Sequence, residues 1–417
     1  KLQEEGSILH RLVGPVVGSM GDAYPELLEN QEFITHLIRS EENRFGKTLG
    51  RGIELFEDEI SVMKESGTKI ISGDKMYLLW DSYGFPADLT QRMAEEAGFG
   101  VDMERFEECM NEQRERSRQA SDFSVTTSFD SLPATEFVGY ESLRCGAELQ
   151  AAEEADGTLQ VVLSHSPFYG ESGGQVGDRG VISADDFRLA VEDTQRDGGR
   201  MVHICRLLEG ELGDVGTGSA VEAEVDDSTR QATERNHSAT HLLHAALREV
   251  LGTHVHQKGS LVDPSRLRFD VTHFSGIEGQ ELQQAQELVN EQVRANLPVE
   301  ITEMDKDEAI EEGAMAFFGE KYGDRVRVVR MGDFSIELCG GTHVSRTGDI
   351  GFFTLTGEGS VSAGVRRVEA LTANDAEAWF DGRVRLVDDL SKLLKVSSDL
   401  VGERISRLLE ENRELKT

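Results

Sequence analysis

Hydrophobic residues recur at helical spacing over the first 120 residues of the chain. Seven of them recur at spacings of mostly three, four or seven residues with charged residues between, as in helices that bury one side. They are Ile34, Leu37, Ile38, Phe45, Leu49, Ile53 and Phe56. Pro86, within SYGFPADL, interrupts the pattern, and a second helical stretch is predicted from Leu89 to about Arg118. We therefore predict a helical domain over residues 1–124.

The pattern changes to short alternating stretches from about residue 125 to 222. LQVVLSH, FRLAVED and MVHICRL read as short strands separated by glycine-rich turns. RDGGR (196–200) predicts a tight hairpin, and EGELGDVGTGSA (209–220) predicts a loop. Several short strands at close spacing favour a small antiparallel β-barrel over residues 125–225.

Helices and strands mix over residues 226–372, which predicts an α/β domain. Its first helix is expected to open after Asp227–Ser228, which are plausible caps, and to close at Gly252. RVRVVRMGDFSIEL and GFFTLTGEGSVSAGVRRVEALT read as strands. GEGSVSAG (357–364) lacks the pattern of a nucleotide-binding loop and is expected to form a hairpin.

The last segment, residues 373–417, is expected to be helical. Apolar residues lie seven apart, whereas the positions between them are mostly polar, so a weak coiled coil or a helical hairpin is predicted. The apolar residues are Val387, Leu394, Val401, Leu408 and Leu415. The predicted fold class is thus multidomain α+β, with a helical domain, a small antiparallel β-barrel, an α/β domain and a C-terminal helix.

Three histidines lie on one side of the first α/β helix. At 100° per residue, His237, His241 and His244 fall within 60° of one another and opposite the leucines and alanines. A solvated polar stripe would explain a single such histidine. Residues at i and i+4 are one turn apart, so His237 and His241 can reach one metal ion. Ser238 follows the first histidine where zinc proteases have glutamate, which disfavours peptidase chemistry.

LCGGTHV supplies a second pair of potential ligands. Cys339 and His343 are four residues apart, and two glycines between them permit an unusual turn. Two histidines, one cysteine and a further histidine suit Zn²⁺, which accepts thiolate and imidazole together. The α/β domain is therefore predicted to hold zinc, with His244 as an alternative ligand or as a partner of one.

Composition adds constraints on location and partners. The net charge is −35, with 11 lysines and 32 arginines against 78 acidic residues, so the chain as a whole repels nucleic acid and a polyanion would need local basic stripes. Such a surface resembles that of halophilic proteins. Four scattered cysteines fit a reducing cytoplasm, and no membrane span or signal peptide is predicted. Both ends read as charged helix, as in a piece of a longer protein.

The same motifs resemble the alanyl-tRNA synthetase family over nearly all of the chain. HSATHLLHAALREVLGTHVHQKGSLV followed by ELCGGTHV is similar to that family's editing domain, and FYGESGGQVGDRG (168–180) to its Gly-Gly-Gln motif. EENRFGKTLGRG and GDKMYLLWDSYGFPADLT resemble the end of its tRNA-recognition domain, with Trp80 where tyrosine is usual. GVRRVEALT and the terminal helix resemble its last editing strand and the start of its coiled coil. No ATP-binding class II core is found, so ligase activity, ATP and Mg²⁺ are expected only upstream.

The resemblance implies a function and a set of site residues. The expected reaction is hydrolysis of serine or glycine wrongly esterified to tRNA(Ala), whose aminoacylated 3′ end would be the partner. Zinc would be held by His237, His241, Cys339 and His343. The editing pocket would include Gln257 and be bordered by Gly173, Gly174 and Gln175. Contacts to tRNA are expected from Asp74, Arg366 and Arg367, although adjacent residues on a strand face opposite ways, so at most one of the two arginines should reach phosphate.

Two alternatives remain open at the level of sequence. The threonyl-tRNA synthetase editing module has the same ligand pattern, although FYGESGGQVGD and the helical N-terminal part argue against it. A zinc-stapled RNA-binding module without catalysis is the other. The terminal helix also suggests a homo-oligomer in the full-length protein.

Overall fold

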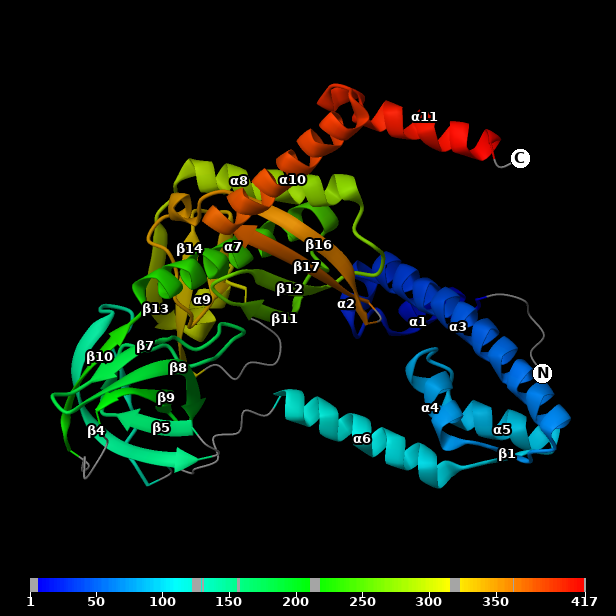
Figure 1. Cartoon of the computed structure of the whole chain (residues 1–417), viewed down its shortest axis with the longest axis horizontal. Helices are drawn as coiled ribbons and strands as arrows, with labels where there is room; N and C mark the ends of the chain where they lie inside the picture. Colours follow the sequence, from blue (N-terminus) through cyan, green and yellow to red (C-terminus); the bar gives the residue numbers. More distant parts are fainter. Residues whose placement is uncertain are drawn as a thin grey trace. The chain divides into compact units, whose positions relative to one another are not determined.

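The structure is a computed structural model that describes residues 7–121, 129, 131–155, 158–210, 218–315, 323–362 and 364–415. The chain forms two compact units, Lys1–Ser124 and Val125–Thr417. The predicted fold class is confirmed, since the described residues form a helical part, a closed antiparallel barrel, further sheets packed with helices, and C-terminal helices (Figure 1).

The first unit is mainly helical. Its core joins Phe56, Ile60 and Met63 of the long helix α3 to Ala94 and Phe99. Phe85, just before Pro86, is fully buried. The elements are η1 (Leu9–Leu12), α1 (Val13–Met20), α2 (Pro25–Glu29), α3 (Gln31–Ser66), β1 (Ile70–Ile71), α4 (Gly73–Asp81), α5 (Ala87–Ala97), β2 (Gly100–Val101) and α6 (Met103–Ser121).

The predicted single helical stretch from Leu89 to about Arg118 is wrong in one respect. It consists of two helices, because α5 ends at Gly98, whose φ of 82° is left-handed. Gly100 and Val101 then pair with Ile70 and Ile71 as a short parallel sheet before α6 begins. The break contains two glycines, Gly98 and Gly100, which were a usable signal that the hydrophobic period alone did not include.

The second unit contains a closed barrel with strand order β10-β4-β5-β9-β8-β7. Its strands are β4 (Arg144–Ala155), β5 (Thr158–Leu163), β7 (Gly180–Ser183), β8 (Phe187–Asp197), β9 (Arg200–Gly210) and β10 (Ala220–Val225). Outside the barrel, β3 (Glu136–Phe137) pairs with β6 (His165–Ser166). The hairpin predicted at RDGGR joins β8 to β9. Residues 211–217 of the predicted loop lie outside the described residues.

The remaining strands form two sheets, and helices pack against them (Figure 1). One sheet has the order β11-β12-β17-β16, from β11 (Gln257–Val262), β12 (Leu267–Thr272), β16 (Phe353–Ser362) and β17 (Val365–Thr372). The other consists of β13 (Val299–Asp305), β14 (Arg325–Met331) and β15 (Ser335–Leu338). The helices are α7 (Asp227–Leu251), α8 (Gly279–Ala295), α9 (Lys306–Glu311) and η2 (Thr347–Ile350). The expected hairpin at 357–364 joins β16 to β17, with residue 363 outside the described residues.

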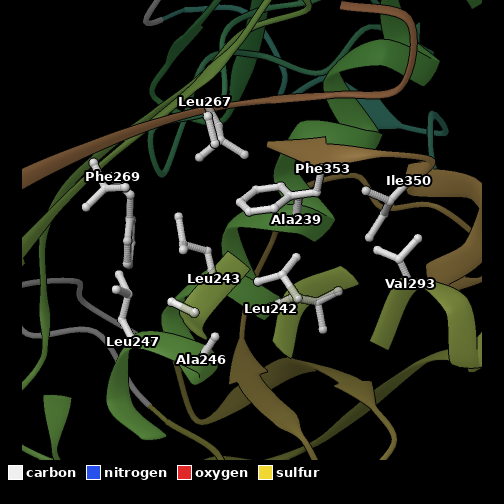
Figure 2. Close-up of a cluster of buried hydrophobic side chains, with 14 of the residues drawn as sticks. Ala239, Leu242, Leu243, Ala246, Leu247, Leu267, Phe269, Val293, Ile350 and Phe353 are labelled. Atoms are coloured by element: carbon white, nitrogen blue, oxygen red, sulfur yellow. The ribbon is translucent and has the colours of Figure 1, made fainter. Parts of the chain in front are cut away.

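Helix α7 is buried on two sides. Its leucines and alanines pack on β12, α8 and the start of β16, as Figure 2 shows for Leu242, Leu243 and Phe353. Each of the leucines contributes about 1.5–3 kcal/mol on burial, and each alanine less. The three histidines occupy the opposite side and are also buried. The helix begins one residue earlier than predicted, because Asp226 is the cap and its carboxylate accepts the amide hydrogen of Thr229.

The C-terminal residues form two helices, α10 (Ala373–Leu394) and α11 (Val401–Glu414), with η3 (Ser398–Leu400) between them. Lys395, with a φ of 55°, ends α10. The seven-residue repeat therefore crosses a break, and one continuous coiled-coil helix is excluded. No helix in the described part of the chain is long and apolar enough to cross a membrane.

A buried ion pair ties the start of α7 to the barrel. The Arg230 guanidinium donates to both carboxylate oxygens of Asp178, with Nε at 3.1 and 2.9 Å, and to the carbonyls of Gly139 and Pro167. Arg230 and Asp178 are 2% and 3% exposed. Asp178 also accepts the amide hydrogen of Tyr169. All these groups are satisfied inside the protein, so removing one would leave a buried charge without a partner.

We predict that Arg230→Leu lowers the free energy of unfolding of the second unit by about 3–5 kcal/mol, the usual cost of breaking a buried pair from one side. Denaturant unfolding followed by circular dichroism would measure it. Arg206→Leu, which removes an exposed pair with Glu192, should cost less than about 1 kcal/mol. Equal losses in the two variants would contradict a special role for Arg230.

Candidate metal centre

Four side chains from two parts of the chain converge beside the barrel. His237 and His241 come from successive turns of α7, Cys339 directly follows β15, and His343 ends the CGGTH turn. One ligand atom of each lies within 4.8 Å of the others. Sγ of Cys339 is 3.4 Å from Nε2 of His237 and 3.4 Å from Nε2 of His343. The two predicted pairs are thus brought together.

Gln175 of the barrel fixes the orientation of His237. Its side-chain oxygen accepts the amide hydrogen of Thr342 at 3.0 Å, and its nitrogen donates to the Thr342 hydroxyl at 3.0 Å. These two bonds identify which end of the amide is oxygen. The same oxygen lies 2.7 Å from Nδ1 of His237, so Nδ1 must carry the proton. In the neutral imidazole, Nε2 of His237 is then the ring nitrogen without a proton. It can bind a metal ion, and it faces Sγ of Cys339 at 3.4 Å.

Glu337 fixes the orientation of His241 and of its neighbour His244. This fully buried carboxylate contacts Nδ1 of His241 through one oxygen and Nδ1 of His244, at 2.7 Å, through the other. A carboxylate can only accept, so both Nδ1 atoms carry protons. Burial disfavours charge on both partners, but their attraction prevails, raising the pKa of His241 to about 10 and lowering that of Glu337 to about 2. His244 lies behind His241, outside the group of four.

Ser238 positions the fourth ligand. Its hydroxyl accepts the amide hydrogen of Val344 and lies 3.2 Å from Nδ1 of His343. Ser238 thus occupies the position of a protease glutamate but holds a histidine in place. Each of the three imidazoles in the group has its Nδ1 engaged by a polar partner, and each directs Nε2 at the same point. This arrangement is typical of metal-binding histidines.

Glycines allow the barrel to approach this closely. Gly174 has a φ of 86°, and a Cβ there would lie 2.6 Å from the carbonyl oxygen of Ser260. Its own carbonyl accepts the amide hydrogen of Val262 on β11 at 2.7 Å. At Gly341, a Cβ would lie 2.1 Å from Cε1 of His237. Any side chain at either position would displace the Gln175–His237 contact.

The four donor atoms fit Zn²⁺. A tetrahedral ion with usual bond lengths separates sulfur from nitrogen by about 3.6 Å, close to the observed 3.4 Å. Nε2 of His241 is buried and has no hydrogen-bond partner among the described residues, as expected of an atom that binds an ion. Burial alone would raise the pKa of the Cys339 thiol, but the imidazoles of His237, His343 and His241 hold it well below its usual value. The thiolate that zinc needs is therefore favoured.

The cluster opens onto a cavity of about 590 Å³, within the range of small-ligand sites. Gln257, at the start of β11, and Gly173 line it together with His237, His241 and Cys339. Gln175 lies behind the cavity wall, since it is fully buried against His237. Thr240 also lines the cavity, and its hydroxyl donates to the carbonyl of Asn236, so towards a ligand its oxygen can only accept.

The other predicted residues are not among those that line this cavity. Asp74 is in the first unit, where it is largely exposed and paired with Arg105, which lowers its pKa. On β17, Arg367 donates to both oxygens of Asp270, and Arg366 pairs with Glu358 at 2.5 Å. Both arginine charges are therefore matched within their own sheet.

Sequence reasoning missed several residues of the site. Glu337 stands two residues before Cys339, hence on the same side of a strand, which was a usable signal. Arg327 donates to the carbonyls of Cys339 and Gly341 at 2.9 and 2.8 Å, and stacks on Tyr140, whose hydroxyl donates to Gly340. These two residues brace the CGGTH turn from distant positions, and no local motif marks them.

Comparison with known protein families places the chain among the aminoacyl-tRNA synthetases. The family described as "tRNA synthetases class II (A)" matches residues 1–229, and "Threonyl and Alanyl tRNA synthetase second additional domain" matches residues 326–369, which include Glu337, Cys339 and His343. The chain belongs to the alanyl-tRNA synthetase family.

Several alanine–tRNA ligases are similar to the chain. The chain is 45% identical to that of Chlorobium phaeovibrioides over 98% of its length, 45% to that of Saccharophagus degradans and 46% to that of Methylococcus capsulatus, both over its full length. These matches cover 48%, 48% and 49% of the relatives, so the chain spans about half their length.

We predict that the purified chain binds one zinc ion and that Cys339→Ala loses it, because the thiolate is the only sulfur among the four donors. Elemental analysis after dialysis would measure the zinc-to-protein ratio. Cys145→Ala, a half-buried barrel cysteine, is the matched control and should retain the ion. Unchanged zinc in Cys339→Ala would reject Cys339 as a ligand.

Proposed function

We propose that this chain carries the editing site of an alanine–tRNA ligase and hydrolyses the ester of serine or glycine wrongly attached to tRNA(Ala). The observation that carries the proposal is the histidine–cysteine cluster in the wall of a cavity that also presents Gln257 and Thr240. Family membership supports the choice of tRNA as partner, since the relatives' names state that they join alanine to tRNA.

The physical need for such a site is clear. A pocket built for a methyl group cannot exclude hydrogen and rejects an added hydroxyl poorly, so a second site must remove the errors. Zinc, when bound, would polarise the ester carbonyl, lower the pKa of a water molecule or anchor the ribose. We favour a positioning role in which zinc holds the cavity wall in shape and does not bind the substrate directly, because four protein donors already fill a tetrahedral shell.

Discrimination would fall to the polar groups of the cavity wall. The amide of Gln257 can both donate and accept, and the oxygen of Thr240 can accept, so a serine hydroxyl would satisfy both. An alanine methyl would leave both groups without this partner, at a cost of up to about 1–3 kcal/mol at the buried Thr240. Serine would thus be admitted and alanine disfavoured.

Further parts of the proposal concern the rest of the chain. We assign residues 1–124 to tRNA recognition, 125–225 to a translation-factor-like barrel, 226–372 to editing and 373–417 to the start of a coiled coil. Asp74 and one of Arg366 and Arg367 are proposed tRNA contacts, although the arginines would have to leave acidic partners. A cytoplasmic location and self-association through the C-terminal helices complete the assignment.

A zinc-stapled RNA-binding module is the second candidate. It is favoured by one feature, the saturated donor set, which suits a structural ion. A threonyl-type editing module is disfavoured, because residues 1–229 match class II (A) synthetases and the relatives named above are alanine–tRNA ligases.

We predict that the zinc-loaded chain deacylates Ser-tRNA(Ala) and spares Ala-tRNA(Ala), and that Gln257→Ala lowers kcat/KM for the serine ester about tenfold or more, through loss of one hydrogen bond to the substrate. Release of radiolabelled amino acid from each charged tRNA would measure this.

Gln283→Ala, on α8 and bonded to Glu287, is the control and should leave the rate unchanged. Absence of hydrolysis with one zinc ion bound would leave the RNA-binding module as the better account.

A further inference from the structure

The cavity has a basic rim in an otherwise acidic chain. Among the described residues that line it are three arginines, Arg196, Arg325 and Arg327, and a single acidic residue, Glu337. Glu337 is buried behind His241 and His244 and already engaged by both. In a chain whose net charge is −35, this concentration of guanidinium groups indicates a function.

Two of the three arginines are engaged by the protein. Arg327 is bound by the Cys339 and Gly341 carbonyls and by the ring of Tyr140. Arg325 donates to the carbonyl of Glu303 at 3.3 Å. Arg196 differs, since its side chain makes no hydrogen bond or ion pair with any residue that the structure describes.

The acidic residues near Arg196 have other partners. Glu171 accepts from Gln195 at 2.9 Å, and Asp193 accepts from Gln195 at 2.6 Å. Asp197 lies 3.9 Å from the Arg200 guanidinium. None of these three carboxylates forms a hydrogen bond or ion pair with Arg196.

The position of Arg196 is nevertheless well defined. It is the penultimate residue of β8 and pairs with Met201 across the hairpin. Its Cγ lies 3.2 Å from the point where a Cβ would stand at Gly170, so the stem packs on that glycine beside Tyr169. Arg196 and Tyr169 both line the cavity, so the arginine reaches it from the barrel side.

We propose that Arg196 binds a backbone phosphate of the 3′-terminal segment of a tRNA and forms a phosphate subsite where the cavity opens to solvent. This inference rests on the proposed function, because an ester seated at the cluster would leave the polynucleotide to exit past the rim. A guanidinium on a fixed stem offers two parallel N–H donors to phosphate oxygens. The barrel would thereby hold the substrate while the α/β domain reacts with it.

Kinetics with Ser-tRNA(Ala) test the subsite. Arg196→Gln should raise KM about tenfold with kcat within about twofold, and should reduce the slope of log affinity against log salt by about 0.7, the value for one phosphate contact to a single strand. Arg196→Lys should recover part of the loss. Arg188→Gln removes the same charge from an exposed position of the same strand, outside the cavity lining, and should change neither quantity.

A binding measurement separates this inference from the proposed function. The probes are a C-C-A trinucleotide and a lone adenosine without phosphate, each carrying serine at the 3′ position through a non-hydrolysable amide. Arg196→Gln should weaken binding of the trinucleotide about tenfold and leave the nucleoside unaffected.

The outcomes are distinct. Equal weakening of both probes, or of neither, overturns the phosphate subsite even if the wild-type chain is an active deacylase. If the wild-type chain shows no hydrolysis and still binds the trinucleotide through Arg196, the editing function is contradicted and the phosphate subsite is supported. If the wild-type chain binds neither the trinucleotide nor the nucleoside, both the phosphate subsite and the editing function are contradicted.

Discussion

The hydrogen bond between Gln175 and His237 is the contact on which the site depends, because it joins two differently folded parts of the second unit. The barrel supplies an amide whose oxygen is identified by Thr342, and that oxygen holds a proton on Nδ1 of the imidazole. Nε2 is thereby freed for a metal ion. Arg230 and Asp178 fix the start of the same helix to the same barrel, so the position of the histidine is set twice.

The candidate metal centre is therefore built by both the barrel and the α/β domain. Each ligand histidine is oriented by a different partner: Gln175 from the barrel, Glu337 from β15 and Ser238 from α7. The glycines at 174 and 341 bring these layers within hydrogen-bond distance. The barrel thus belongs to the chemistry of the site, and the proposed role of Arg196 extends this from the ligands to the substrate.

Much of this arrangement could be predicted from the sequence, for physical reasons. The helical spacing of His237 and His241 and the short CxxxH turn are local patterns, and the short strands around glycine pairs indicated a barrel. The break at Gly98 was missed because the prediction followed the hydrophobic period and not the glycines, and the cap at Asp226 because Asp227 and Ser228 beside it are equally suitable cap residues. The interruption at Lys395 agrees with the helical hairpin that the sequence left open beside a coiled coil. The roles of Tyr140, Arg327 and Arg196 could not be predicted. Tyr140 reaches the turn across 200 residues, Arg327 reaches it from a neighbouring strand, and Arg196 stands in a hairpin with no chemical motif.

The most direct test of the central claim is the zinc affinity of Gln175→Leu, measured by competition with a chelator of known affinity. If the barrel amide orients His237, affinity should fall about 10- to 100-fold, as for loss of other partners of metal-binding histidines. Gln195→Leu, in the same barrel but bonded only to Glu171 and Asp193, should bind zinc like the wild-type chain. Equal affinities for the two variants and the wild type would contradict the account.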